Sequence, residues 1–448
     1  MLSVEQARDS AQSLVEQARR AGADAADAVY IGSKSQGVQV RLGELEHVDF
    51  SEGEDVGLRV FVGQQSASVS TSDFSNEALS ALVERAVAMA REAPEDPYAG
   101  LAPAQLIARG PFPDIDAEDR SAPGPQELRE SALAAERAAR AVEGVTNSSG
   151  GSAGRSASTM ALATSSGFSG ASRSTGHSIS VSVIAGEGPT MQRDGAWHGA
   201  RHLSDVDAPE IVGRLAGDRA IAKLNPGKPQ PGRYPILFDP RVAGSLVTHF
   251  AASISGGSIA RKASFLLSKL GERIFADGVR IVDDPLRPRG LRSRAFDGEG
   301  LPVARMDFVS DGILRTWTAE SASARQLGIQ PTGHAVRGAG GAPGAGPSNL
   351  FIEAGNRTRE ELLASYPEAI LVTELIGQGI NYVTGDYSRG AAGFMVRNGE
   401  IAEPVAEITI ASNLLEMFAT LEPGSDLEFR RGIDSPTLLL PEMTVAAA

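Results

Sequence analysis

Residues 28–70 read AVYIGSKSQGVQVRLGELEHVDFSEGEDVGLRVFVGQQSASVS, and they set the fold class expected for the first half of the chain. Short apolar runs with a period of two occur around 38–40, 58–62 and 67–69, and glycine-containing turns separate them. This alternation is typical of half-buried strands, and short turns with glycine join antiparallel neighbours. The stretch therefore predicts an antiparallel β-meander.

Amphipathic helices are expected on both sides of this meander. The N-terminal run MLSVEQARDSAQSLVEQARRAG has apolar residues at helical spacing, and Ser3 and Gln6 have the spacing of a capping box. Further helices are predicted at about 76–92, 126–142 and 207–224 from the same periodicity.

Two segments between these helices have unusual compositions. Residues 94–125 contain seven prolines and little periodicity, so we expect a long surface connection there. Residues 145–190 are rich in Ser, Gly and Thr, yet Ser178–Val183 alternate regularly between polar and apolar residues. We therefore predict antiparallel strands with small side chains in the second segment.

The segment Asn225–Pro229 is the best candidate for a domain boundary, because Pro and Gly interrupt the periodic pattern there. We expect a mixed α/β domain over residues 1–225 and a β-rich domain over residues 230–448. In the second domain, two helices are predicted, one through His249 and one at about 359–365. Its predicted strands are 234–238, 279–282, 305–309 and 394–396. The whole chain is accordingly expected to be α+β.

Composition excludes several classes of function. The net charge of −14 argues against non-specific nucleic-acid binding, which needs Lys and Arg to neutralise phosphates, and against a peripheral anchor on anionic lipid. The sequence contains no run of about 18 apolar residues, so we expect no membrane span. Its N-terminus lacks the basic head and apolar core of a signal peptide. The chain has no cysteine, which is compatible with a reducing compartment. We expect a cytoplasmic protein.

The helical run around His249 contains this one histidine and no Asp, Glu or Cys that could complete a metal site. Residues 244–270 read GSLVTHFAASISGGSIARKASFLLSKL, and His249 is followed by Phe250 and Ile254. A catalytic zinc needs about three protein ligands and a nearby carboxylate that takes a proton from water. One imidazole does not hold zinc, and Phe250 neither ligates nor acts as a base. The sequence therefore predicts no metal site and no catalytic residue here.

Several blocks carry a family resemblance over essentially the whole chain. They are Gly256-Gly257-Ser258 with Arg261-Lys262, Asp311–Leu314, Thr332–Ala335 and residues 373–413, TELIGQGINYVTGDYSRGAAGFMVRNGEIAEPVAEITIASN. Together they resemble the TldD/PmbA family of zinc metallopeptidases. Active members of that family carry His-Glu-x-x-x-His where this chain has His249, Phe250 and Ile254, and they take a cysteine as a further ligand. The pattern resembles the PmbA (TldE) branch, which lacks the motif.

The resemblance implies a function for a complex rather than for one chain. It implies a heterodimeric assembly in which a TldD-like subunit holds the zinc and this chain has no cofactor of its own. The complex would degrade or trim extended peptides, with this chain as the non-catalytic subunit.

Two loops supply candidate contacts with substrate or partner. His334 and Arg337 open a glycine-rich run at 337–347, which is expected to be a lid over a peptide groove or a mobile surface loop. Asp386, Tyr387 and Arg389 lie in a segment predicted to be a turn between strands. There, Arg389 is a candidate carboxylate-binding fork.

Other patterns have simpler interpretations. His198 and His202 have the His-x-x-x-His spacing, but no adjacent Glu accompanies them, so a metal site is not predicted. The pair Asp283-Asp284 precedes a proline and is expected to form a turn.

Two alternatives to the non-catalytic subunit remain open on the sequence. One is a self-sufficient metallopeptidase with a non-standard site, for example His249 with His334 and a carboxylate. The other is a homo-oligomeric peptide-binding protein, such as a homodimer formed in the absence of an enzymatic partner.

Overall fold

A long antiparallel sheet dominates the N-terminal half of the computed structural model, which describes residues 1–447. Its strands follow the order β3-β2-β1-β4-β5-β6. They are β1 (Ala25–Arg41), β2 (Glu44–Val62), β3 (Gln65–Thr71), β4 (Val145–Thr164), β5 (Ser169–Ala185) and β6 (Gln192–Ala200). The predicted meander and the small-residue strands are both confirmed. Because β1 pairs with both β2 and β4, the segments before and after the proline-rich connection share one sheet.

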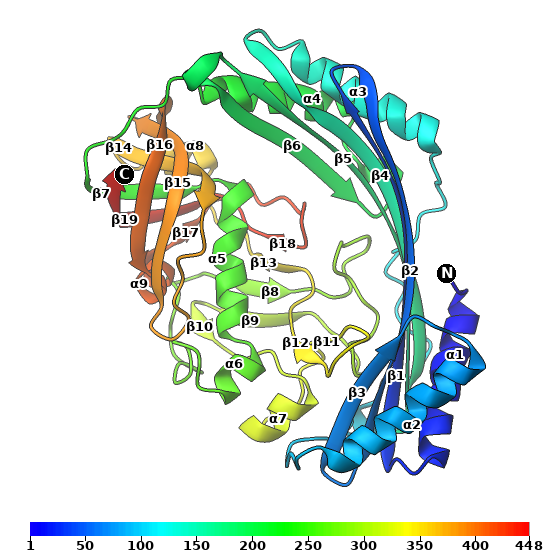
Figure 1. The fold of residues 1–448 in the computed structure, drawn as a ribbon. Coiled ribbons are helices and arrows are strands. Elements are labelled where there is room, and N and C mark those ends of the chain that lie inside the picture. Colours follow the sequence, from blue (N-terminus) through cyan, green and yellow to red (C-terminus); the bar gives the residue numbers. More distant parts are fainter. Residues whose placement is uncertain (448) are drawn as a thin grey trace.

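Four helices cover the outer face of this arched sheet (Figure 1). They are α1 (Val4–Arg20), α2 (Asn76–Glu92), α3 (Pro125–Arg140) and α4 (Pro209–Ala222). The predicted capping box is present in α1, where the Ser3 side chain accepts from the backbone N–H of Gln6. On β5, Ile179 and Val181 are buried in a cluster shared with α3 and α4, whereas Ser180 and Ser182 alternate to the concave face.

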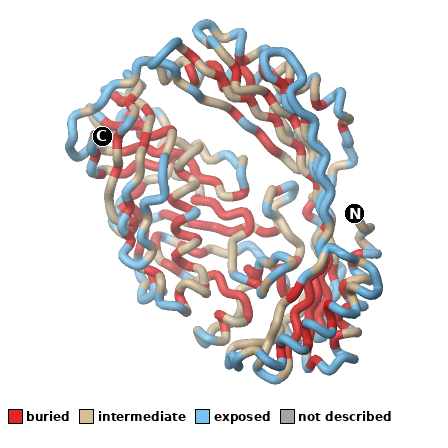
Figure 2. The backbone as a smooth tube through the Cα atoms, in the orientation of Figure 1, coloured by how far each residue is buried: buried red, intermediate tan, exposed pale blue. Residues whose placement is uncertain are grey.

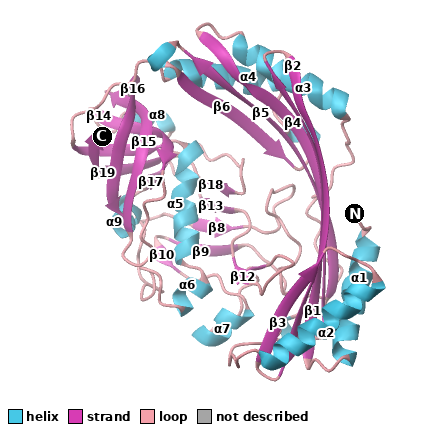
Figure 3. Cartoon of the chain, in the orientation of Figure 1, coloured by secondary structure: helices cyan, strands magenta, loops and turns pink. Residues whose placement is uncertain are grey.

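The C-terminal half is built from two sheets and a small hairpin, as Figure 3 shows. The first sheet has the order β16-β15-β14-β7-β19-β17, and an additional pairing of β16 with β19 closes it into a barrel. Its strands are β7 (Gly232–Phe238), β14 (Glu368–Ile376), β15 (Asp386–Arg397), β16 (Glu400–Asn413), β17 (Glu422–Pro423) and β19 (Leu438–Ala447).

The second sheet has the order β10-β9-β8-β13-β18. Its strands are β8 (Ile281–Asp283), β9 (Met306–Ser310), β10 (Ile313–Leu314), β13 (Leu350–Ile352) and β18 (Ile433–Asp434). The hairpin consists of β11 (Ala335–Val336) and β12 (Gly344–Ala345). The α+β class and the β-rich second half are confirmed.

The C-terminal half holds more helices than the two that the sequence predicts. They are α5 (Pro240–Ser253), α6 (Gly256–Ala260), α7 (Ser321–Leu327), α8 (Arg359–Leu363) and α9 (Leu414–Thr420). The three that were missed have seven residues or fewer, which is too short for a helical period to be read. None of the helices within residues 1–447 has both the length and the apolar character that a membrane span needs.

Helix α5 lies at the centre of the C-terminal core, between the barrel and the second sheet (Figure 1). Leu246, Val247 and Phe250 of this helix are buried with Ile236 of the barrel and Phe308 of the second sheet. Figure 2 shows the buried backbone concentrated there and beneath the helices of the long sheet. The helix that carries His249 is therefore fixed on several sides.

The sequence predicts that the proline-rich connection, residues 94–125, lies on the surface. Part of this connection is buried instead. The Phe112 ring packs at a tilt against Phe168 of the N-terminal half and Phe296 of the C-terminal half, with ring centroids 5.7 and 5.0 Å apart. Ile115 is only 8% exposed. The connection thus packs at the contact between the two halves, and its apolar residues account for that position.

Candidate functional site

A cleft of about 910 Å³ lies between the end of the long sheet and the C-terminal half. One wall is formed by Gly195, Ala196 and Trp197 of β6. Within residues 1–447 this strand, the last in its sheet, pairs only with β5, so its other edge borders the cleft. On this strand the N–H of Gly195 donates to the side chain of Asp194, and its carbonyl accepts from Arg219. The opposite wall includes Arg241 at the start of α5 and Glu374 of β14.

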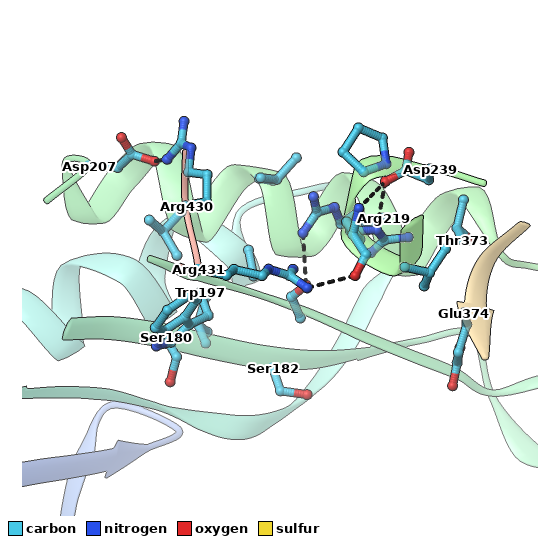
Figure 4. A pocket seen from close by; sticks show the side chains of 18 of the residues that line it. Ser180, Ser182, Trp197, Asp207, Arg219, Asp239, Thr373, Glu374, Arg430 and Arg431 are labelled. Atoms are coloured by element: carbon cyan, nitrogen blue, oxygen red, sulfur yellow. Dashed lines mark hydrogen bonds and ion pairs between the residues drawn. The ribbon is translucent and has the colours of Figure 1, made fainter. Parts of the chain in front are cut away.

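Ion pairs connect the two walls, and Figure 4 shows several of the side chains involved. Arg430 donates to Asp207 across the cleft at 2.6 Å. Lys223, which follows α4, contacts Asp194 of β6 at 2.9 Å and Glu374 at 2.7 Å. These contacts between segments far apart in sequence hold the two halves at a defined separation.

Apolar side chains remain exposed inside this charged cleft. Trp197 is 49% exposed and lies opposite Ser180 on the neighbouring strand. Ile211 and Leu215 of α4 also line the cleft and are 60% and 41% exposed. An open strand edge with apolar side chains beside it can take up an extended peptide, because the edge supplies backbone hydrogen bonds and the side chains bind alternate residues.

His249 lies on α5 in a buried polar group next to the barrel. Only 6% of the residue is exposed, and its Nδ1 atom forms a hydrogen bond of 2.9 Å with the hydroxyl of Tyr382. The ring of Tyr387 lies edge-on, 6.1 Å away. Burial, together with the smaller effect of the positive charge of Arg389, lowers the pKa of His249 to about 4. The imidazole is consequently neutral at pH 7.

Phe250 and Ile254 point into the core rather than into a metal cavity. Both are 0% exposed, and the Phe250 ring packs edge-on against Phe275 and Phe418 at 5.4 and 6.2 Å. The residues at the three motif positions therefore do not fit a zinc ion. Within residues 1–447, no three His, Asp or Glu side chains form a group that can hold a metal ion.

His334 has different neighbours from His249. Its Nε2 atom lies 3.3 Å from Asp283, its Nδ1 atom lies 2.8 Å from the carbonyl oxygen of Thr332, and its ring packs on Phe308. Asp283 itself is fully buried at the end of β8 and binds Ser348, so the predicted turn is wrong at this residue. A site that joins His249 to His334 finds no shared ligand in this arrangement.

The glycine-rich run, expected to be a lid or a mobile surface loop, is anchored to the N-terminal half at two points. The Arg337 side chain is 1% exposed and donates to Asp27 at 2.5 Å, next to Arg59, which also binds Asp27. Farther along, the carbonyl oxygen of Ala339 lies so close to Gly57 of β2 that a Cβ atom there would meet it at 1.9 Å.

The segment with Asp386, Tyr387 and Arg389 begins strand β15, so the predicted turn is wrong; the loop before it ends at Gly385. Tyr387 is 1% exposed, and Asp386 binds Thr384. Arg389 borders a second cavity beside α5. Of the five candidate contacts, Asp386 and Arg389 are the two with accessible side chains, because those of His334, Arg337 and Tyr387 are enclosed.

His198 and His202 do not share a site. His198 lies 3.2 Å from Asp207, and His202 lies 3.2 Å from Asp116. Each imidazole has a carboxylate partner of its own.

Sequence reasoning missed the residues that line the cleft. Three of these residues are Arg241, Arg430 and Arg431. Nothing in the sequence distinguishes them from other arginines, and they belong to no common motif. The only signal is the Arg430-Arg431 pair itself, which by composition alone resembles a solvated charge pair.

Family models match most of the chain. They are the PmbA/TldA metallopeptidase domain 1 at residues 26–90, the central domain at 118–224 and the C-terminal domain at 231–447. The boundary between the last two falls near Asn225–Pro229.

Individual proteins agree with these matches. The Escherichia coli O157:H7 protein named metalloprotease PmbA is 40% identical over 418 residues, which are 92% of this chain and 91% of that protein. The metalloprotease PmbA homolog of Haemophilus influenzae is 37% identical over 98% of this chain and 96% of its own length. The crystal structure of TldE from Thermococcus kodakarensis, at 20% identity, has the same fold, with a TM-score of 0.86 over 97% of this chain and 99% of that one. This chain belongs to the PmbA/TldD metallopeptidase family, in the PmbA (TldE) branch that lacks the His-Glu-x-x-x-His motif.

Proposed function

We propose that this chain is the non-catalytic subunit of a two-component zinc peptidase, whose metal is held by a TldD-like partner. The observation that carries the proposal is the environment of the motif positions. His249 is bound to Tyr382, while Phe250 and Ile254 are fully buried in the apolar core. A zinc site with a general base needs ligating and basic side chains at these places. The lack of cysteine fits a complex that works in the reducing cytoplasm.

The role of this chain in the complex is to hold an extended peptide and to complete the chamber around it. The edge of β6 near Trp197, together with the exposed Trp197 ring and the aliphatic side chains of Ile211 and Leu215, supports this role. At Gly195 the backbone N–H and carbonyl are already bound by Asp194 and Arg219, so pairing with a peptide there would have to displace these side chains. Backbone hydrogen bonds to a strand edge do not depend on the side chains of the bound peptide. This mode of binding suits an enzyme that processes unfolded peptides of varied sequence.

A second strand edge is available for the partner subunit. Residues 44–55 of β2 pair with β1 on one side, whereas β3 pairs only with residues 56–62. Leu45, Val48 and Phe50 on this segment are 45%, 46% and 59% exposed. Exposed apolar residues on an unpaired strand are typical of an interaction surface. We assign this edge, residues 44–55, to association with the TldD-like subunit.

The test is reconstitution from purified chains. The chain alone is assayed for zinc by mass spectrometry and for hydrolysis of an unfolded peptide, and then with a relative that bears His-Glu-x-x-x-His. We expect no zinc and no hydrolysis from the chain alone, and stimulated hydrolysis by the mixture. Replacing the partner's motif glutamate by glutamine should abolish that activity, whereas His249→Ala in this chain should leave the zinc content unchanged.

Two other outcomes would replace the proposal. Stoichiometric zinc in the isolated chain, with hydrolysis abolished by His249→Ala, establishes a self-sufficient metallopeptidase. Failure to associate with any such relative, combined with peptide binding by a homodimer, establishes a peptide-binding protein without an enzymatic partner.

A further inference from the structure

A second cavity, of about 390 Å³, is lined by four arginines and by no acidic side chain. The arginines are Arg241, Arg292, Arg389 and Arg431. They come from the start of α5, the segment between β8 and β9, strand β15 and the segment before β18. Four cations gathered from four separate segments need an anion or nearby carboxylates to offset their repulsion.

Within residues 1–447, only one of the four arginines forms ion pairs. Arg241 contacts Asp194 at 3.4 Å and Asp239 at 3.6 Å. Within residues 1–447, no Asp or Glu forms an ion pair with Arg292, Arg389 or Arg431. The Nε atom of Arg389 is buried and has no hydrogen-bond partner.

Arg431 has only a neutral partner, although an aspartate is close by. Its Nη1 atom donates to the carbonyl oxygen of Arg241 at 2.6 Å. The carboxylate of Asp434 accepts the backbone N–H groups of Arg430, Arg431 and Gly432. Asp434 keeps its negative charge and offsets part of the charge of Arg431, but it does not line the cavity. The excess of positive charge there comes from Arg292 and Arg389, which form no ion pair within residues 1–447.

We propose that this cavity binds the C-terminal carboxylate of an extended peptide. Guanidinium groups present paired N–H donors that match the two oxygens of a carboxylate. The flank of the 14-residue α5 from Arg241 to Thr248 also borders the cavity, while the N-terminus of the helix is capped by the carboxylate of Asp239.

The apolar part of the cavity favours a chain terminus over an internal acidic side chain. Val242, Leu375 and Ile433 line it beside the arginines. A C-terminal residue carries both a carboxylate and a side chain. The carboxylate can bind the arginines while the side chain contacts the apolar residues. An internal Asp or Glu brings the carboxylate alone.

The cavity lies beside the main cleft, which connects this inference to the proposed peptide-holding role on which it rests. Arg241, Val242, Leu375 and Arg431 line both spaces. A peptide along the edge of β6 would thus reach the arginines with its end. In this arrangement the chain selects the end of the substrate and thereby its direction in the chamber.

The experiment measures peptide binding by the full chain alone, through fluorescence anisotropy. The probes are three decapeptides of Ala, Ser and Gly, labelled at the N-terminus. One has a free C-terminal carboxylate, the second is amidated, and the third is amidated and carries an internal Asp. We expect the free carboxylate to bind at least about tenfold more tightly than the amide, because a charge-assisted hydrogen bond contributes about that factor. Arg292→Gln and Arg389→Gln should each reduce this ratio towards one.

Arg292 is exposed and its side chain has no carboxylate partner, so its replacement carries little risk to folding. Arg140→Gln, at the exposed end of α3, is the matched control and should keep the full ratio. Equal affinity for carboxylate and amide, or no binding of any probe, overturns the inference. If the internal Asp peptide binds as tightly as the free carboxylate, the cavity recognises acidic side chains instead, and the assignment to a chain terminus is wrong. Because no partner is present, these results are independent of the reconstitution test.

Discussion

The Nδ1 atom of His249 and the hydroxyl of Tyr382 lie 2.9 Å apart, which joins α5 to the loop before β15. This hydrogen bond engages one ring nitrogen of the histidine at the first motif position. Arg389 adds a positive charge nearby, which opposes a second cation at this place. The residues at the three motif positions are thus part of the structural core.

Tyr382→Phe should destabilise the protein by about 1–3 kcal/mol, because it leaves the buried Nδ1 of His249 without its partner. Urea unfolding followed by circular dichroism measures the free energy of unfolding. Tyr366→Phe is the control: this ring is partly buried against α8, and its hydroxyl forms no hydrogen bond within residues 1–447. Equal effects of the two substitutions would show that the His249–Tyr382 contact contributes nothing specific.

Stability should fall between pH 6.5 and 4 in a way that depends on His249. Its folded-state pKa of about 4 lies below the ordinary value of 6.5, so the unfolded state binds more protons in that interval. The contribution of the neutral His249 to the free energy of unfolding is fully present above pH 6.5 and is lost as the pH falls towards 4. Its size is at most about 3 kcal/mol. Burial lowers the pKa of His177 and His198 as well.

For that reason the measured quantity is the difference in unfolding free energy between the wild type and His249→Gln across this pH range. The wild type should lose more stability on acidification than the variant. Parallel pH profiles would show that His249 titrates normally in the folded protein.

Gly57→Ala should separate the glycine-rich loop from the long sheet. A Cβ atom at Gly57 would meet the carbonyl oxygen of Ala339 at 1.9 Å, so one of the two backbones must shift. Overpacking of this kind costs about 1–3 kcal/mol. Thermal unfolding and limited proteolysis within residues 337–347 are the measurements.

The same strand offers the control for this substitution. At Gly53 the nearest atom to an added Cβ lies 3.9 Å away, so Gly53→Ala should be neutral. Similar behaviour of the two variants would mean that the loop does not rest on β2.

Phe50→Asp should weaken association with a TldD-like subunit by at least about tenfold, because it places a charge in an apolar contact. Leu270→Asp, at a residue that is 43% exposed in the C-terminal half, should leave association unchanged. Analytical ultracentrifugation of the mixed chains gives both affinities. An unchanged affinity for the Phe50 variant would place the partner on another surface.

The sequence by itself determined the features that depend on neighbouring residues. The alternation in 28–70, the capping box at Ser3 and Gln6 and the long amphipathic helices are local patterns, and each element lies where it was predicted. The degenerate motif at His249, Phe250 and Ile254 was identified through the family resemblance, which assigns these positions. The short helices and the position of Asp386–Arg389 in a strand were missed, because segments this short show no clear periodic pattern of apolar residues.

Only the tertiary structure decided which distant residues share a site. The cleft needs β6, α4 and the start of α5 together, and the arginine cavity draws on residues from 241 to 433. Arg337, which the sequence places in a loop, is buried and forms an ion pair with Asp27, more than three hundred positions away in the sequence. Charge and burial act through space, whereas sequence patterns report only what lies within a few residues along the chain.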